Sequence, residues 1–424
     1  MFESLTRPAT GALPKGAWLT VGFLWLAGAS NYLTRTMLTT MRGSVIADIP
    51  MTDAQFGLLT TIFLWVYAFA SPLGGFFADR FSRRHVIIFS ILAWSTITWI
   101  TAHVHTFQEF LILRALLGLS EACYIPAAMA LIADYHRGST RSLATGIHMS
   151  GLVLGSVIGG VGGWLAESHG WNYAYTVIGL PNLIYSLFLV LVLREAPREA
   201  ADDHATGAAV PKVGFIAAME NLACTWPFYI VIASWCLQGA VSWMIIGWMP
   251  THMKEQYHLG QGAAGFSALG YVYVMQFLGL LIGGFWSDRC SVRNPQARIV
   301  IPAITLLVVA PAFWLTGFYD GIAFTILSLA GWGLAAGFLG ANMMPIICMT
   351  IDVRYRATAL GVLNCFTACF GGVAVYFVGA LRDAQVGIRS ILTMAGFGVL
   401  FCGVLLYLVS VVLTRRAHGS RTTL

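Results

Sequence analysis

The chain has 424 residues, of which 58% are hydrophobic and only 10% are charged. A soluble domain carries roughly 25% charged residues, so this chain cannot cover a water-facing surface of ordinary size. A helix needs about 20 apolar residues to cross a bilayer, and twelve crossings would use about 240 positions. The hydrophobic residues number about 246. These figures indicate a multi-pass membrane protein and exclude soluble enzymes, nucleic-acid binders and secreted scaffolds.

Charged residues divide the sequence into twelve apolar stretches, which predict twelve membrane-spanning helices. We expect them at 16–40, 54–78, 85–106, 107–133, 142–166, 171–193, 226–250, 262–287, 299–319, 321–351, 357–381 and 390–413. No cleavable signal peptide is evident, so the first stretch is interpreted as a retained span. The eight cysteines show no paired metal-ligand spacing, and we expect neither a metal site nor a cofactor.

The distribution of basic residues predicts the orientation of these helices. Eighteen of the 24 Lys and Arg residues fall in segments on the side of the N-terminus, and four fall in the opposite loops. Cytoplasmic loops are enriched in Lys and Arg, so both termini are predicted to be cytoplasmic. We expect a bacterial inner-membrane protein whose net charge of +6 reflects its topology and not a nucleic-acid partner.

A polar connection and an internal repeat divide the chain into two halves. The connection mixes both charge signs with Pro, Gly and Ala, as linkers do. Gly74-Gly-Phe-Phe-Ala-Asp-Arg80 matches Gly283-Gly-Phe-Trp-Ser-Asp-Arg289 at five of seven positions. Duplicated bundles are typical of transporters. The predicted organisation of this all-α membrane protein is a tail at 1–15, a six-helix bundle at 16–193, a cytoplasmic linker at 194–225, a second pseudo-symmetric bundle at 226–413 and a tail at 414–424.

The segment that begins at Gly75 and ends at Arg84, Gly-Phe-Phe-Ala-Asp-Arg-Phe-Ser-Arg-Arg, resembles the loop signature G-x-x-x-D-R-x-G-R-R of the major facilitator superfamily. Ser82 replaces the last glycine. The resemblance implies the twelve-helix fold of that superfamily over essentially the whole chain. Charges at these helix ends are predicted to latch the two halves in one state, although they could simply anchor the helices at lipid headgroups. The predicted latch residues are Asp79, Arg80, Arg83, Arg84, Asp134, Asp288 and Arg289.

Two further motifs narrow the resemblance. Arg114-Ala-Leu-Leu-Gly-Leu-Ser-Glu121-Ala resembles the R-x-x-x-G-x-x-E-A of the anion:cation symporters, which include sialin, hexuronate and aldonate carriers. Asn31-Tyr-Leu-Thr-Arg35 resembles their N-Y-x-D-R. Spinster-type transporters share both patterns and are the second match. Thr34 replaces the acid that those symporters use for proton coupling, which leaves a uniporter or exchanger as alternatives.

Glu121 is predicted to be the only one of eighteen acidic residues at mid-membrane depth. An ionisable group there is costly and is a functional-site hypothesis by default, so we assign proton coupling to Glu121. Arg114 lies seven residues earlier on the same helix face, and Arg35 lies one turn from Asn31. Two arginines suit a carboxylate substrate, so Arg35, Arg114, Asn31 and Tyr32 are predicted substrate contacts. A structural pair between Arg114 and Glu121, or a structurally buried Glu121, is the alternative.

The second half carries no charge inside its predicted spans, and its polar side chains alternate with aromatic ones. Such a surface suits a hydroxylated, sugar-like body, although packing between helices explains it equally. Glycines spaced by four residues from 151 to 163 predict close helix packing. His148 lies near the start of that stretch. We interpret it as incidental to function, and a role in proton transfer is the alternative. The predicted substrate contacts of this half are Gln238, Tyr271, Gln276 and Asn364.

The sequence therefore predicts a secondary active transporter and not an enzyme. We expect it to move a small anionic substrate, a sugar acid or another carboxylate, together with protons by alternating access. It is expected to act as a monomer in the lipid bilayer. The alternatives are a spinster-type carrier of lipids or amphiphiles, and a receptor without transport activity that uses the same fold.

Overall fold

The computed structural model describes residues 13–14, 16–136, 140–196, 215–319 and 321–419. Most of the predicted N-terminal tail, the end of the predicted C-terminal tail and most of the predicted linker at 194–225 therefore lie outside the described residues. The chain divides into two compact units. Unit 1 contains Met1–Pro50 and Val66–Ala205, and unit 2 contains Met51–Trp65 and Thr206–Leu424.

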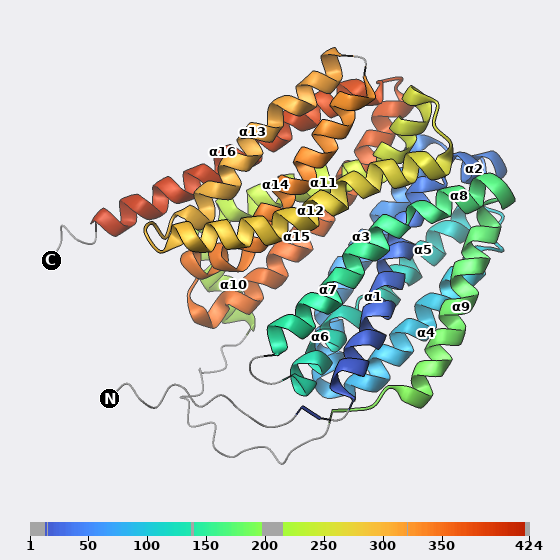
Figure 1. Cartoon of the computed structure of the whole chain (residues 1–424), viewed down its shortest axis with the longest axis horizontal. Helices are drawn as coiled ribbons and strands as arrows, with labels where there is room; N and C mark the ends of the chain where they lie inside the picture. Colours follow the sequence, from blue (N-terminus) through green and yellow to red (C-terminus); the bar gives the residue numbers. More distant parts are fainter. Residues whose placement is uncertain (1–12, 15, 137–139, 197–214, 320, 420–424) are drawn as a thin grey trace. The chain divides into compact units, whose positions relative to one another are not determined.

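Unit 1 consists of helices in the part of the chain that the structure describes (Figure 1). Helix α3 begins in unit 2 and ends in unit 1. The helices of unit 1 are α1 (Ala17–Thr40), α2 (Arg42–Asp48), the second part of α3 (Asp53–Arg80), α4 (Arg83–Thr101), α5 (Phe107–Glu121), α6 (Tyr124–Tyr135), α7 (Arg141–Ile158), α8 (Gly160–His169) and α9 (Trp171–Val192).

Unit 2 is likewise helical over its described residues, and it includes the first part of α3. Small residues allow its helices to approach closely, since a Cβ atom at Gly337 would overlap the backbone carbonyl of Gln276. The helices of unit 2 are α10 (Phe215–Cys224), α11 (Trp226–Tyr257), α12 (Gln261–Ser291), α13 (Ala297–Phe318), α14 (Ile322–Thr350), the short 3₁₀ helix η1 (Val353–Tyr355), α15 (Arg356–Asp383) and α16 (Ile388–Gly419).

The twelve predicted spans correspond to these helices with small differences. Eleven described segments are long and apolar enough to cross a membrane, and α1 is not among them. The reason is its polar content, because Asn31, Thr34 and Arg35 interrupt its apolar sequence. The fourth predicted span consists of α5 and α6, and the fifth consists of α7 and α8. Both interruptions were missed by the sequence analysis.

The glycine repeat of the fifth span packs α7 directly against α1. A Cβ atom at Gly151 would lie 2.5 Å from the carbonyl oxygen of Trp25, and one at Gly155 would overlap the carbonyl oxygen of Ala29. Thr36 donates a hydrogen bond back to the carbonyl of Ser156 at 3.4 Å. The close approach predicted from the sequence is therefore present, and it fixes the helix that carries Arg35.

Gly155→Ala is expected to lower the melting temperature of the purified protein by several degrees. Overpacking costs about 1–3 kcal/mol where the neighbour cannot move, and here the neighbour is the backbone of α1. Gly146→Ala is the matched control, because Gly146 lies on the same helix and a Cβ atom there meets nothing within 4 Å. Thermal unfolding followed by tryptophan fluorescence measures both. Equal melting temperatures for the two variants would contradict the packing argument.

The interruption between α5 and α6 follows from Pro126. Proline has no N–H group, so it cannot donate the helical hydrogen bond to the carbonyl of Ala122. The second part of α3 packs at this point, because a Cβ atom at Gly74 would lie 2.5 Å from the Ala122 oxygen. Glu121 is the last residue of α5. The fourth span therefore presents Glu121 at a break in its backbone.

Candidate functional site

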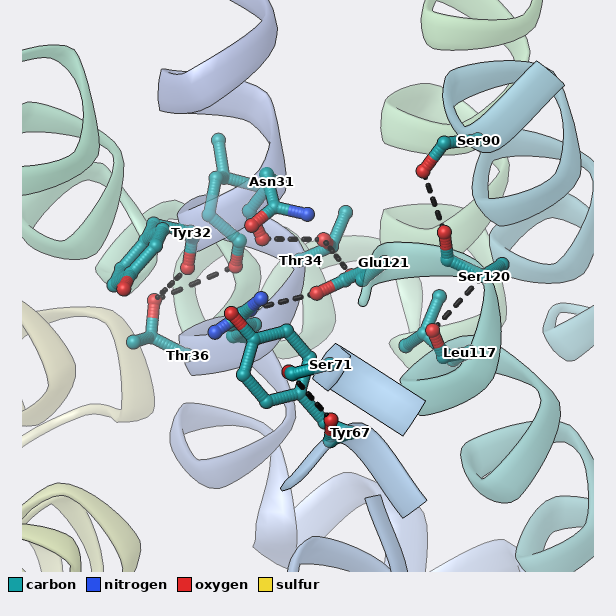
Figure 2. Close-up of polar contacts among 12 residues, drawn as sticks. Asn31, Tyr32, Thr34, Thr36, Tyr67, Ser71, Ser90, Leu117, Ser120 and Glu121 are labelled. Atoms are coloured by element: carbon teal, nitrogen blue, oxygen red, sulfur yellow. Dashed lines mark hydrogen bonds and ion pairs between the residues drawn. The ribbon is translucent and has the colours of Figure 1, made fainter. Parts of the chain in front are cut away.

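A buried ion pair joins α1 to α5 in unit 1 (Figure 2). Nε of Arg35 donates to Oε2 of Glu121 at 2.6 Å. Glu121 is 0% exposed and Arg35 is 4% exposed. A buried charge is tolerated where it is paired and hydrogen-bonded, so each of these residues makes the other possible at this depth.

Two tyrosine rings hold the guanidinium of Arg35. Its Cζ lies 4.8 Å from the ring centre of Tyr32 on α1 and 4.4 Å from that of Tyr67 on α3. Figure 2 shows Tyr32 and Tyr67 beside the ion pair. A planar guanidinium stacks on aromatic faces, which an ammonium group does less well. Tyr67 was missed by the sequence analysis, because an aromatic residue inside an apolar helix gives no signal of its own.

Thr34 lies next to Glu121, at the position where the N-Y-x-D-R motif has its acid. Its hydroxyl donates to the carbonyl oxygen of Asn31 at 2.8 Å, and Oε1 of Glu121 lies 3.5 Å away. The side chain of Asn31 is fully buried near the same carboxylate. An acid at position 34 would therefore face Glu121 directly. Threonine avoids that repulsion and leaves Glu121 as the carboxylate of the site.

Arg114 adds a second positive charge to this group of residues. It is 2% exposed on α5, and it lies within electrostatic reach of Glu121 and Arg35. Glu121 forms an ion pair with Arg35. Two guanidinium groups and one carboxylate give the ionised site a net positive charge. Such a site favours an anion.

The predicted contacts of the second half are polar residues on α11, α12 and α15 of unit 2. Gln238 donates to the Ser242 hydroxyl one turn along the same helix at 2.9 Å. Tyr271 and Asn364 are exposed, and Gln276 is half-buried. No hydrogen bond between any two of these four is recorded in the described part of the chain. Their role therefore stays a prediction.

Three of the seven predicted latch residues form ion pairs within their own unit. In unit 1, Arg83 pairs with Asp134 and also donates to the carbonyl of Ala130 at 3.3 Å. In unit 2, Asp288 accepts from Arg298 at 2.8 Å, a partner that the sequence analysis did not name. Arg80 and Arg289 are exposed, Arg84 donates to the carbonyls of Leu193 and Val190, and the side chain of Asp79 lies outside the described atoms.

His148 packs between helices of unit 1. Its Nδ1 lies 3.1 Å from the carbonyl oxygen of Leu24, and the hydroxyl of Tyr124 donates to the same oxygen at 2.7 Å. The side chain is fully buried. His148 therefore connects α7 to α1 through a hydrogen bond. A role of His148 in proton transfer stays a hypothesis.

A second charged cluster lies in unit 2 and was also missed. Arg382 donates to Asp53 at 2.7 Å and to both carboxylate oxygens of Glu255 at 3.0 and 2.9 Å. Its Cζ lies 5.3 Å from the ring centre of Trp248. The carboxylate of Asp383 accepts from the first backbone N–H groups of α3. The cluster thus fixes the start of α3 against α15.

Two units of membrane-spanning helices and a buried charged site are together typical of a membrane transporter. The sequence model of the Major Facilitator Superfamily matches residues 24–375. The chain therefore belongs to the Major Facilitator Superfamily, and the predicted fold class is confirmed.

Individual proteins of known sequence and structure are similar to this chain over most of its length. The chain is 27% identical over 377 residues to an MFS-type efflux pump of Mycolicibacterium smegmatis, covering 88% of this chain and 86% of the pump. It is 24% identical over 417 residues to a probable galactarate/D-glucarate transporter of Bacillus subtilis, covering 91% of each chain. Among solved structures, a bacterial homologue of the human lysosomal transporter spinster superposes with a TM-score of 0.82 at 21% identity, covering 96% of this chain and 99% of that one.

These relatives confirm the resemblances that the sequence motifs indicated. Both a sugar-acid transporter and a spinster-type fold are found among them. Because relatives of this superfamily are transporters, the prediction that the protein is not an enzyme is also confirmed.

Proposed function

We propose that the protein is a secondary active transporter of a small organic anion, such as a sugar acid, coupled to protons. The observation that supports this most directly is the Arg35–Glu121 ion pair with Arg114 nearby. A carboxylate substrate matches a guanidinium in bidentate geometry. The similarity to a galactarate/D-glucarate transporter supports the same substrate class.

Coupling follows from competition for Arg35. In the empty site, Arg35 stabilises the ionised form of Glu121 at 2.6 Å. A substrate carboxylate that binds Arg35 takes this partner away, and a buried carboxylate without a cation is strongly disfavoured. Glu121 then binds a proton, so substrate and proton load together. Only one carboxylate is needed, which fits the threonine at position 34.

The predicted substrate contacts form two groups, one that binds the charge of the substrate and one that forms hydrogen bonds with it. Arg35, Arg114, Asn31 and Tyr32 are proposed to hold the negative end of the substrate. Gln238, Tyr271, Gln276 and Asn364 are proposed to hydrogen-bond its hydroxyl groups. Rearrangement of the helix-end charges would accompany alternating access in this proposal.

Uptake into proteoliposomes tests the proposal. A thermal-shift screen against sugar acids, short carboxylates and lysolipids first identifies a ligand, because binding to the folded state raises its apparent stability. The radiolabelled ligand is then offered with an inward proton gradient, with no gradient, and with a membrane potential alone. Accumulation only in the presence of the proton gradient supports proton symport. Equilibration without accumulation identifies a uniporter or exchanger instead.

The spinster-type alternative rests on a specific observation, the TM-score of 0.82 to the bacterial spinster homologue. In that case the substrate is a lipid or amphiphile. Stabilisation by lysolipids and no stabilisation by any sugar acid in the same screen would favour it over an organic anion.

We further propose that both termini and the 194–225 linker are cytoplasmic, in the inner membrane of a bacterial cell. Single cysteines placed at positions 10, 205 and 421 in a cysteine-free background are expected to resist an impermeant maleimide added to intact cells. They should react after the membrane is permeabilised. A cysteine at position 386, between α15 and α16, is the control that should react from outside. Labelling of position 205 in intact cells would reverse the orientation.

A further inference from the structure

A cavity of about 670 Å³ lies in unit 1 where α3 ends, α4 begins and α9 ends. Its lining includes Arg80, Arg84 and Arg194, together with Glu195 and the apolar side chains of Phe81 and Leu191. The membrane-spanning segments next to it end at Ala78 and Val192 and begin at Arg83. The cavity therefore lies at the level where the helices leave the membrane.

The acidic residue of the cavity is already engaged. The carboxylate of Glu195 accepts from the Ser82 hydroxyl at 2.5 Å and from the backbone N–H groups of Arg83 and Arg84 at 3.1 and 3.3 Å. It occupies the N-terminal end of α4, where an anion is stabilised by the first N–H groups. The helix terminus is thus filled from within the protein.

The positive charges of the cavity exceed what Glu195 can balance. Arg84 donates to the carbonyls of Leu193 and Val190, which are neutral acceptors. The side chains of Arg80 and Arg194 are exposed, and no hydrogen bond or ion pair of either is recorded in the described part of the chain. Among the lining residues that the structure describes, three guanidinium groups and one carboxylate leave an excess of two positive charges. The cavity is therefore suited to an anion.

The apolar rim indicates that the anion carries hydrocarbon chains. Phe81 is 59% exposed and Leu191 is 79% exposed at the cavity itself. Phe77 and Leu187, about one turn further into the membrane-spanning helices, are also exposed. A soluble anion would leave this apolar surface uncovered, whereas the acyl chains of a lipid would cover it.

We propose that this cavity binds the phosphate headgroup of an anionic phospholipid. Arg80 and Arg194 contact the phosphate, and the acyl chains lie along Phe81 and Leu191. Basic pockets between helix ends at the membrane surface are suited to such headgroups. The site is separate from the Arg35–Glu121 pair and does not depend on which substrate the protein carries.

Binding of fluorescent phosphatidylglycerol to the purified full-length protein, measured by microscale thermophoresis, tests the proposal. The double variant Arg80→Ala/Arg194→Ala should weaken binding about 25-fold, since each arginine near a membrane surface contributes about fivefold. Arg289→Ala/Arg293→Ala is the matched control, because it removes the same charge from exposed residues at the end of α12, outside the cavity. It should change binding less than about twofold. Equal losses of affinity in both double variants would show that binding depends only on the net charge of the protein, and would contradict the proposed site.

Competing ligands distinguish a lipid phosphate from a free phosphate, and a single mild variant shows that any loss of binding is not caused by misfolding. Phosphatidylcholine, which has no net charge, should bind much more weakly than phosphatidylglycerol. Inorganic phosphate at about 10 mM, an ionic strength at which charges are only weakly screened, should not displace phosphatidylglycerol. Displacement by inorganic phosphate would identify a soluble anion as the ligand and overturn the lipid assignment. The single variant Arg194→Gln, which changes only an exposed side chain, should lose about fivefold. Wild-type affinity in a folded Arg194→Gln protein would contradict the proposal.

Discussion

Replacing Glu121 with glutamine is expected to abolish substrate accumulation and to leave substrate exchange across the membrane intact. Glutamine keeps the shape of the side chain and can still accept a hydrogen bond from Arg35 at the observed distance of 2.6 Å. It cannot bind and release a proton. In proteoliposomes with an inward proton gradient, the accumulation ratio should fall to about one, while counterflow of labelled substrate continues.

Glu109→Gln is the matched control for this experiment. Glu109 lies at the first turn of the same helix α5, where it forms a capping box with Thr106, and glutamine serves equally well in that motif. This variant should accumulate substrate as the wild type does. If Glu121→Gln still concentrates substrate when the proton gradient is the only driving force, another group couples transport to protons.

Arg35→Lys is expected to weaken substrate binding by about tenfold or more, although it keeps the positive charge. Lysine loses the planar fork that pairs with a carboxylate in bidentate fashion, and it loses much of the stacking on Tyr32 and Tyr67. Isothermal titration of the ligand identified by the thermal-shift screen measures this loss. Arg42→Lys, at the start of α2, is the control and should bind like the wild type.

The Arg35–Glu121 ion pair also predicts that alanine at position 35 affects folding and substrate binding separately. Arg35→Ala leaves Glu121 buried without its partner, and such a change destabilises a protein by about 3–5 kcal/mol. Adding Glu121→Gln removes the unpaired charge, so the double variant should recover much of the melting temperature of the wild type. It should not recover substrate binding. Wild-type affinity in the double variant would remove Arg35 from the substrate site.

The sequence was sufficient to predict most of the helices and to single out the buried charged residues Arg35, Arg114 and Glu121. Glu121 and Arg35 stood out because an ionisable group within an apolar stretch is rare and costly. Their separation of 86 positions carried no information on pairing, and Arg114 was an equally reasonable partner for Glu121. The pairing of Arg35 with Glu121 depends on where α1 lies, and contacts of α1 with other helices, such as that of Ala29 with Gly155 on α7, contribute to its position.

Two other contacting residues, Tyr67 and Glu195, gave no sequence signal that could have been used. Tyr67 is one aromatic residue among many on a membrane-spanning helix, and only the position of α3 brings its ring to Arg35. Glu195 belongs to a polar connection, where a carboxylate is unremarkable until it meets the start of α4. Pro126 did offer a signal for the break after Glu121, because a proline within a helix removes a backbone hydrogen bond.

The distance along the chain between Arg35 and Glu121 has a consequence for synthesis of the protein. The ribosome produces α1 first, and this helix carries a guanidinium whose insertion into lipid is costly while it has no partner. Its carboxylate partner is made 86 residues later. We therefore expect α1 to wait at the insertion machinery or at the membrane surface until α5 emerges. The two helices are then expected to enter the lipid as a neutralised pair, so the ion pair of the proposed substrate site would also guide assembly of the nascent chain.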